Sequence, residues 1–296
     1  MEPVLRWYRK AGRLLPWRGT REAYRILLSE IMLQQTGVGR VMEKYPEFLR
    51  RFPTLRALAR AERSEVVVAW RGMGYNNRAV RLHLLARIVM SDHDGTLPDT
   101  EAALMGLPGV GKYTARALLS SVHREPAAVV DVNVRRFYSR LFHRMKTEDA
   151  VCSETRAWTI ADRLIPARRS YDWNQALMDL GATVCTARRP RCGVCPVAGA
   201  CRSREGMAPA RRTHRRPEPG LHGVPNRIYR GRIIEVLRSG RKGTAWRMDD
   251  IGTKILPACG HDHRSWLTAV LRTLEADGLV LLRHSRRAAS TLIALA

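Results

Sequence analysis

The sequence predicts a mainly α-helical protein with a small α+β domain at its C-terminal end. From about residue 4 to 206, apolar residues recur at helical spacing, and short segments rich in Pro, Gly or capping residues interrupt them. Alternating strand patterns are scarce there, and no repeat of fixed period occurs. Two strand-like runs follow helical segments near the C-terminal end. We therefore expect a helical body followed by a compact mixed domain.

The helical pattern is strongest in five segments of the body. Each places apolar residues three and four positions apart, so one face of each helix is expected to be buried. The segments are 22–35, 64–73, 78–91, 113–123 and 172–184.

Composition changes after Cys201. A basic, proline-containing linker is expected over 207–226; it either contacts a polyanion or is a solvated tether. Beyond it, 227–296 contains helix candidates at 228–237 and 263–276 and strand candidates at 278–283 and 290–295. Helices followed by a basic hairpin resemble a winged helix, which is often a DNA-binding module. A winged helix that binds protein remains the alternative.

The charge balance points to a polyanionic partner. The 296 residues include 52 Lys and Arg against 27 Asp and Glu, a formal net charge of +25, and most of the cations are Arg. Guanidinium groups bind phosphate through paired hydrogen bonds, so nucleic acid is favoured over a membrane surface. A GC-rich genome would also raise the arginine content, so composition alone does not decide.

No apolar run approaches the roughly 20 residues that a membrane span requires. The N-terminal segment carries Arg and Lys throughout and lacks the apolar core of a signal peptide. Hydrophobic residues make up 45% of the chain, which is enough for a buried core. We expect a folded intracellular protein, cytoplasmic and associated with the nucleoid, with no membrane partner.

Four cysteines form the clearest motif. Cys185, Cys192, Cys195 and Cys201 have the spacing C-x6-C-x2-C-x5-C. In an intracellular protein this spacing favours a metal site over disulfides. Zinc and a [4Fe–4S] cluster both accept four cysteines, but zinc sites more often pair two C-x2-C hooks and this loop has one. The spacing therefore favours the cluster.

A second motif, LPGVGKYTA over 107–115, follows one predicted helix and begins another. Gly109 and Gly111 allow a tight turn whose amides point outward at a helix N-terminus, a position that favours anions. Asp131 follows about 20 residues later. Glu30 lies within an apolar helix, where burial raises the pKa of a carboxyl and lets it hold a proton.

These motifs together resemble the endonuclease III and MutY branch of the helix-hairpin-helix (HhH-GPD) DNA glycosylases. The resemblance covers about residues 1–205 and includes the segments 15–18 (LPWR), 72–75 (GMGY) and 174–181 (NQALMDLG). It implies a two-lobed core over 1–206, with a six-helix lobe at about 24–131. The cluster lobe would comprise 1–23 and 132–206, with a structural [4Fe–4S] cluster on the four cysteines.

The resemblance also implies roles for the two carboxylates. Glu30 would donate or relay a proton to the departing base, and Asp131 would stabilise positive charge on the sugar and help position water. Tyr113 would belong to the base pocket. The partner would be double-stranded DNA carrying a mismatched or damaged base, bound by a monomer. Expected DNA contacts are Gln34, Gln35, Asn77, Arg78, Leu107, Gly109, Gly111, Lys112, Thr114 and Arg135.

The second residue after Gly111 bears on the reaction. Bifunctional members of the family carry there a Lys that forms a Schiff base, whereas this chain carries Tyr113. Lys112 is one position earlier, and one helical step rotates a side chain by about 100°, so it is a poor substitute. We expect a monofunctional glycosylase with little or no lyase activity.

The excised base is less determined. Tyr113 and the run Tyr75-Asn76-Asn77 resemble the MIG-type thymine mismatch glycosylases, whereas 33–36 (LQQT) has the MutY form. We expect thymine or uracil opposite guanine. The alternatives are a MutY-like adenine glycosylase acting opposite guanine or oxidised guanine, and a catalytically silent DNA-damage binding protein. Intact Glu30 and Asp131 argue against the last.

Overall fold

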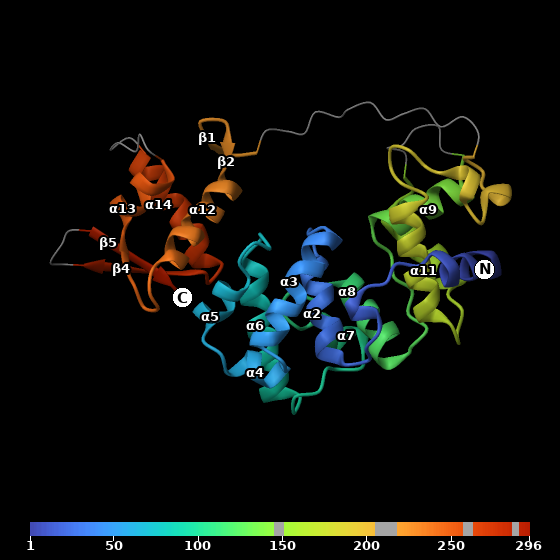
Figure 1. Ribbon diagram of the computed structural model, residues 1–296, viewed down its shortest axis with the longest axis horizontal. Helices are drawn as coiled ribbons and strands as arrows, with labels where there is room; N and C mark the ends of the chain where they lie inside the picture. Colours follow the sequence, from blue (N-terminus) through green and yellow to red (C-terminus); the bar gives the residue numbers. More distant parts are fainter. Residues whose placement is uncertain (145–150, 205–217, 257–262, 286–289) are drawn as a thin grey trace. The chain divides into compact units, whose positions relative to one another are not determined.

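The computed structural model describes residues 1–144, 151–204, 218–256, 263–285 and 290–296 (Figure 1). The chain forms two compact units: unit 1 contains Met1–Glu30 and Leu97–His214, and unit 2 contains Ile31–Thr96 and Arg215–Ala296. The described part is mainly helical with a small sheet near the C-terminal end, as expected. None of its helices combines the length and apolarity needed to cross a membrane.

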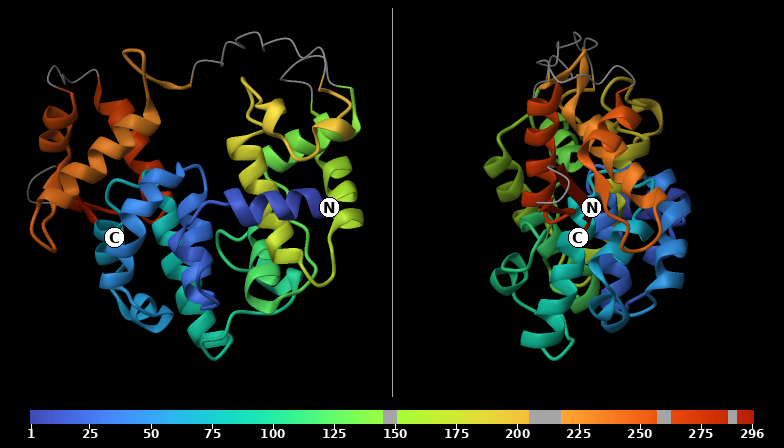
Figure 2. Two further views of the ribbon diagram at one scale, coloured as in Figure 1. Left: turned by 45° about the vertical axis from the view of Figure 1, so that its right-hand side comes forward. Right: turned by 90° about the vertical axis from the view of Figure 1, so that its left-hand side faces the viewer.

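Unit 1 is built from short helices around an apolar core. The core gathers Leu5, Val134, Phe137, Trp158 and Leu177, all buried. Helices α9 and α11 lie side by side, and α1 packs on α11 (Figure 2). The elements are α1 (Glu2–Ala11), η1 (Pro16–Arg18), α2 (Ala23–Leu33, whose last turn belongs to unit 2), α7 (Glu101–Met105), α8 (Lys112–Leu118), η2 (Leu119–His123), α9 (Val132–Phe142), α10 (Glu154–Leu164), α11 (Ser170–Thr183), η3 (Cys192–Val194) and η4 (Ala198–Ala200).

The helical part of unit 2 comprises α3 (Val38–Arg51), α4 (Leu55–Arg60), α5 (Arg63–Ala69) and α6 (Asn77–Asp92). Capping residues set where these helices begin: the Thr54 side chain accepts from the Ala57 amide, and Glu62 and Glu65 form a capping box at α5. In its interior the Phe48 ring packs edge-on against Trp70 and at a tilt against Phe52.

The C-terminal domain has the element order of a winged helix. It contains β1 (Gly220–Leu221), β2 (Val224–Pro225), α12 (Asn226–Ser239), β3 (Trp246–Arg247), α13 (Met248–Ile255), α14 (Arg264–Ala276), β4 (Val280–Ser285) and β5 (Ser290–Leu295). The three-stranded sheet is antiparallel in the order β3-β5-β4. Both predicted helices and both predicted strands are present, whereas the short α13 and β3 were not expected. The basic turn between β4 and β5 falls on 286–289, outside the described residues.

The C-terminal domain packs against the helical part of unit 2. Val67 of α5 belongs to the same buried cluster as Tyr229, Ile233 and Leu237 of α12. The two units differ from the lobes that the sequence suggests. Residues 97–131 belong to the same unit as α9, α10, α11 and the cysteine loop, and residues 227–296 belong to the same unit as 31–96. Of the expected linker, 207–217 lies outside the described residues. Its remainder, 218–226, holds the β1–β2 hairpin, whose Leu221 carbonyl accepts from the Tyr229 hydroxyl at 3.2 Å.

Candidate active site

Three of the residues expected at the active site influence one another within unit 1. Glu30 lies on α2 and is only 8% exposed. Burial, opposed by the charge of Arg18 and reinforced by Asp131, raises the pKa of the Glu30 carboxyl to about 7. Its buried Oε2 atom has no hydrogen-bond partner among the residues that the structure describes. Glu30 can therefore hold a proton at neutral pH and give it to a group that enters the site.

Asp131 is the N-cap of α9. Its Oδ1 accepts from the amides of Asn133 at 2.9 Å and Val134 at 2.7 Å, and its Oδ2 accepts from Asn133 Nδ2 at 2.8 Å. These donors, at the positive end of the helix, stabilise a carboxylate. Asp131 is thus a fixed negative charge beside a carboxyl that can stay neutral, which is the pairing of unlike carboxyl groups that the sequence predicts.

Tyr113 is in the first turn of α8. Burial, with the negative charges of Glu30 and Asp131, raises the pKa of its phenol well above the ordinary value, so it is a neutral hydroxyl. That hydroxyl donates to the Met178 sulfur at 3.2 Å. The neighbouring Lys112 is exposed, and its Nζ lies 4.6 Å from the centre of the Trp158 ring. The two side chains are thus engaged by different partners.

Behind these groups lies an ion cluster that sequence analysis missed. Asp179 of α11 has no exposed side-chain surface and accepts from Arg13 and from both terminal nitrogens of Arg18, at 2.8 Å. Burial favours its neutral form, but the hydrogen bonds from Arg18 and Arg13 outweigh it and lower the pKa of Asp179. The cluster fastens Arg18, whose charge reaches Glu30.

The glycine turn joins α7 to α8, as predicted for a hairpin of helices. Gly109 has a left-handed backbone (φ +82°), and the Val110 amide donates to the Leu107 carbonyl at 3.1 Å. Gly111 and Lys112 are exposed, whereas the side chains of Leu107 and Thr114 are buried. Leu107 and Thr114 can therefore face DNA only through their backbone.

All but one of the remaining predicted DNA contacts lie in unit 2, and the prediction for Arg78 is wrong. Arg78 is only 6% exposed, and its guanidinium donates to the carbonyls of Ile31, Met32 and Gln34 at 3.0, 2.8 and 2.5 Å. Its other terminal nitrogen donates to Thr36 Oγ1 and to the Met73 and Gly74 carbonyls. A guanidinium so engaged cannot bind phosphate. It instead joins the loop after α2 to the turn before α6.

The loop that Arg78 secures presents the expected glutamines. Gln35 is exposed with a left-handed backbone (φ +56°), and Gln34 is half-buried. Asn77, at the start of α6, is half-buried as well. Arg135, on α9 in unit 1, uses its Nε to donate to the Cys152 carbonyl at 2.7 Å.

The four cysteines line one small cavity of about 30 Å³ in unit 1, together with apolar residues such as Val184 and Val197. Within the described residues, no three Cys, His, Asp or Glu side chains meet closely enough to hold a single metal ion. A zinc ion, with Zn–S bonds of about 2.3 Å, would draw its four sulfurs to one point. A [4Fe–4S] cluster takes four cysteine thiolates, each on a different iron, so the four-cysteine donor set of this loop fits the cluster.

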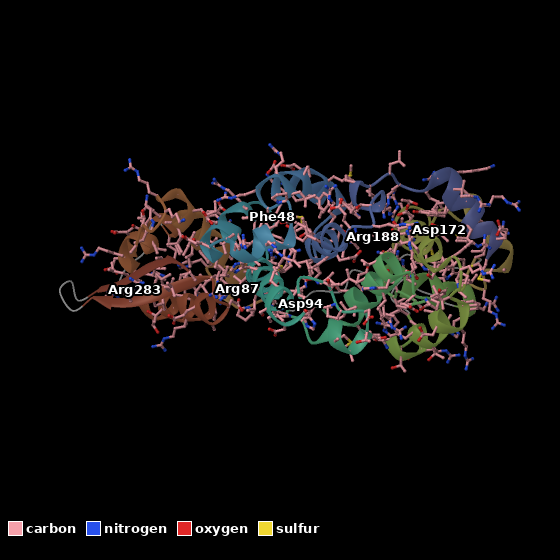
Figure 3. The ribbon with its side chains drawn as sticks, turned by 90° about the horizontal axis from the view of Figure 1, so that it is seen from below. Phe48, Arg87, Asp94, Asp172, Arg188 and Arg283 are labelled. Carbon is pink, nitrogen blue, oxygen red and sulfur yellow. The ribbon has the colours of Figure 1, made fainter. Side chains whose placement is uncertain are left out.

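Helix α9 holds the cysteine loop from one side. Arg140 donates to the carbonyls of Thr186 at 2.7 Å and Ala187 at 2.8 Å, and Arg136 donates to those of Cys185 at 2.9 Å and Gly181 at 2.7 Å. The sequence pattern did not predict these contacts of Arg136 and Arg140, because arginines on an apolar helix face usually extend to solvent. Arg188, by contrast, belongs to the loop itself (Figure 3).

Comparison with known proteins bears directly on this site. A model of the HhH-GPD superfamily of base excision DNA repair proteins matches residues 28–161, and a model of the iron–sulfur binding domain of endonuclease III matches residues 185–201. The chain is 41% identical over 238 residues to an adenine DNA glycosylase of Mycobacterium tuberculosis, covering 80% of this chain and 77% of that protein. The chain belongs to the HhH-GPD superfamily.

This chain is therefore a DNA glycosylase, which hydrolyses N-glycosidic bonds, with a [4Fe–4S] cluster on the cysteine loop. It is also 42% identical over 236 residues to an adenine DNA glycosylase of Mycolicibacterium smegmatis, covering 79% of each chain. Among solved structures, a thermostable thymine-DNA glycosylase is 33% identical with a TM-score of 0.64, covering 69% of this chain and 94% of that one. The relatives named adenine DNA glycosylases thus favour adenine, the alternative substrate, over the pyrimidine that Tyr113 led us to expect.

Proposed function

We propose that this glycosylase excises adenine mispaired with guanine or oxidised guanine. The observation that carries the proposal is the buried Glu30 carboxyl, whose pKa is raised to about 7 and whose Oε2 has no hydrogen-bond partner in the described part of the chain. The mycobacterial relatives, which are named adenine DNA glycosylases, support it. The enzyme would bind duplex DNA as a monomer.

Adenine needs an acid more than a pyrimidine does. When the bond between the sugar and an unprotonated adenine breaks, the base departs as a high-energy anion, whereas protonation of a ring nitrogen lets it depart neutral. Thymine and uracil spread the negative charge over two carbonyl oxygens and depend less on an acid. A carboxyl that keeps its proton up to pH 7 suits the purine.

The neighbouring residues complete the reaction. As the glycosidic bond breaks, positive charge develops on the sugar, and the Asp131 carboxylate stabilises it. Water adds to the sugar carbon and gives its proton to the Glu30 carboxylate, while adenine keeps the proton that Glu30 donated. The chemical step thus consumes one water and leaves an abasic site.

Strand cleavage is not expected to follow. A lyase needs an amine that can attack the sugar carbon, and Tyr113 holds a neutral hydroxyl at that position. Lys112 Nζ is engaged over Trp158, 4.6 Å from the ring centre. Abasic DNA would therefore be released intact.

Thymine or uracil opposite guanine is the second candidate substrate. Tyr113 is the observation in its favour, because its ring reduces the space that a purine requires. The 33% identity with a thermostable thymine-DNA glycosylase is consistent with it.

Single-turnover excision on four matched duplexes distinguishes these functions. The duplexes carry adenine opposite guanine, adenine opposite oxidised guanine, thymine opposite guanine and uracil opposite guanine. Alkali reveals abasic sites, and a parallel sample without alkali reveals lyase activity. We expect strand breaks from the two adenine duplexes, and only after alkali. Excision confined to the pyrimidine duplexes would overturn the proposal, and excision of none by the cluster-containing enzyme would favour a binding protein.

A further inference from the structure

Unit 2 contains a groove of about 880 Å³ that the catalytic reaction does not use. One wall is the turn Gly72–Asn77 before α6, and the other is formed by α12 together with parts of α13 and α14. The groove thus lies where the glycosylase fold meets the winged-helix domain. Its first wall is within the segment matched by the glycosylase superfamily, residues 28–161.

The backbone conformation of the turn Gly72–Asn77 exposes the side chain of Tyr75. Gly72, Gly74 and Tyr75 all have left-handed backbone angles, with φ of +84°, +67° and +42°. Such a conformation is unfavourable for Tyr75, and it persists because Arg78 donates to the carbonyls of Met73 and Gly74. The Tyr75 ring is left 49% exposed. An exposed aromatic ring on a fixed turn is a typical contact surface for nucleic acid.

The opposite wall is cationic. The groove is lined by five cations, Arg227, Arg230, Arg232, Arg238 and Lys254, against two carboxylates, Glu235 and Asp277. Three of these arginines are engaged: Arg227 with Glu218, Arg230 with Asp277, and Arg238 with Glu235. Arg232 and Lys254 are exposed, each lies 5.3 Å from the centre of an aromatic ring (Tyr229 and Trp246), and neither has a carboxylate partner within the described residues. A ring does not neutralise a cation as a carboxylate does. Their charges are available to an external anion.

The two walls are fixed to one another. The Arg238 guanidinium, with 3% of its side chain exposed, donates to the Val67 carbonyl at 2.6 Å and to Asn76 Oδ1 at 3.0 Å. Glu235 also pairs with Arg71 at 2.7 Å. Through these hydrogen bonds the buried Arg238 fixes the position of α12 relative to the turn that carries Tyr75. The groove is therefore preformed.

We propose that this groove binds the phosphate backbone of duplex DNA beside the mispair, with Arg232 and Lys254 each contacting a phosphate. The winged-helix domain then extends the DNA-binding surface of the glycosylase rather than serving as a protein-docking module. The proposal depends on the DNA glycosylase activity but not on which base is excised.

A second groove in unit 2 provides a matched control. It has a volume of about 690 Å³ and is also lined by cations, including Arg87 of α6 and Arg241 after α12 (Figure 3). Lys242 in that groove is already paired with Glu62 at 2.9 Å and Glu65 at 3.4 Å. Among the described residues that line this groove, none is an aromatic residue with a left-handed backbone. Arg87→Ala/Arg241→Ala removes the same number of exposed charges as Arg232→Ala/Lys254→Ala.

The test measures the affinity of the full-length, cluster-containing protein for an undamaged duplex from low to moderate NaCl. Each phosphate contact contributes about 0.9 to the slope of log K against log salt. We expect Arg232→Ala/Lys254→Ala to reduce that slope by about 2 and to weaken binding about tenfold or more. The control double variant should change the slope by less than half as much. Circular dichroism establishes that both variants are folded.

Single-turnover excision at saturating enzyme should be unchanged in Arg232→Ala/Lys254→Ala, because the groove does not contain Glu30, Tyr113 or Asp131. Equal losses of slope in the two double variants would overturn the proposal in favour of a diffuse charge effect. An unchanged slope in both would overturn it in favour of a partner other than DNA.

Discussion

Asp179 and Glu30 are both buried carboxyl groups of unit 1, and their surroundings are opposite. Asp179 accepts from two arginines, and those hydrogen bonds overcome burial and lower its pKa. Glu30 has the unpartnered Oε2, and burial raises its pKa to about 7. Arg18 forms an ion pair with Asp179, whereas it acts on the Glu30 carboxyl only through the electrostatic effect of its charge.

The difference separates a structural from a chemical carboxyl. A buried carboxylate with its charge paired holds elements together, and removing it leaves cations without a partner. A buried carboxyl without a partner weakens the fold whenever it ionises, so a sequence that retains one gains something other than stability. The two residues should therefore respond to substitution in opposite ways.

The largest effect is expected for the reaction. Glu30→Gln keeps the shape but cannot donate the proton, and we expect single-turnover excision to fall by about 10²–10⁴-fold. Glu22→Gln, an exposed residue just before α2, is the control and should leave the rate unchanged. A Glu30→Gln enzyme with the wild-type rate would remove Glu30 from the mechanism.

The next effect concerns folding. Asp179→Ala strands Arg13 and Arg18 in a partly buried place, and we expect the free energy of unfolding to drop by about 3–5 kcal/mol. Asp172→Ala, on the same helix but exposed (Figure 3), should cost little. Urea denaturation of the two variants makes the comparison. Equal small losses in both would show that the ion cluster contributes no net stability.

The pH dependence of excision should follow Glu30. The acid is active while protonated, so the rate constant should be level below pH 7 and fall about tenfold per unit above it. Single-turnover rates measured at intervals from about pH 5.5 to about pH 9 would locate the transition. A rate that rises with pH across neutrality would instead indicate a general base.

The smallest expected effect is on the free energy of unfolding, which the ionised Glu30 carboxylate lowers. A carboxyl whose pKa is higher in the folded state favours folding below its unfolded pKa and loses that contribution as pH rises through about 7. Glu30→Gln should therefore match the wild type near pH 5 and exceed it by up to about 3 kcal/mol at pH 8. Thermal melts at the two pH values measure it. A constant difference at both would mean that Glu30 is not proton-linked to folding.

Local pattern was enough for much of the fold and for the cysteine loop. Glu30 stood out because a charged residue within an apolar helix has few structural explanations, and the four cysteines because their spacing is short. Two of the three strands of the C-terminal sheet, β4 and β5, were visible as apolar runs, whereas β3 was not. These signals all lie within about twenty residues of sequence.

The features that were missed depend on distant residues. Asp179 lies 161 positions from Arg18, and nothing near either indicates the pairing. Arg78 was assigned to DNA on the family resemblance, whereas its guanidinium is occupied by carbonyls at the end of α2 and just after it, more than forty positions away. Tyr113 was given too much weight on the choice of base, since one side chain does not define the volume of a pocket.

Helix α9 connects the cysteine loop to the Asp131 carboxylate. Asp131 caps the start of the helix, and Arg136 and Arg140 of the same helix donate to carbonyls of the cysteine loop, so eleven helical residues join the two sites. A shift of the cysteine loop is therefore expected to act through α9 on the position of Asp131.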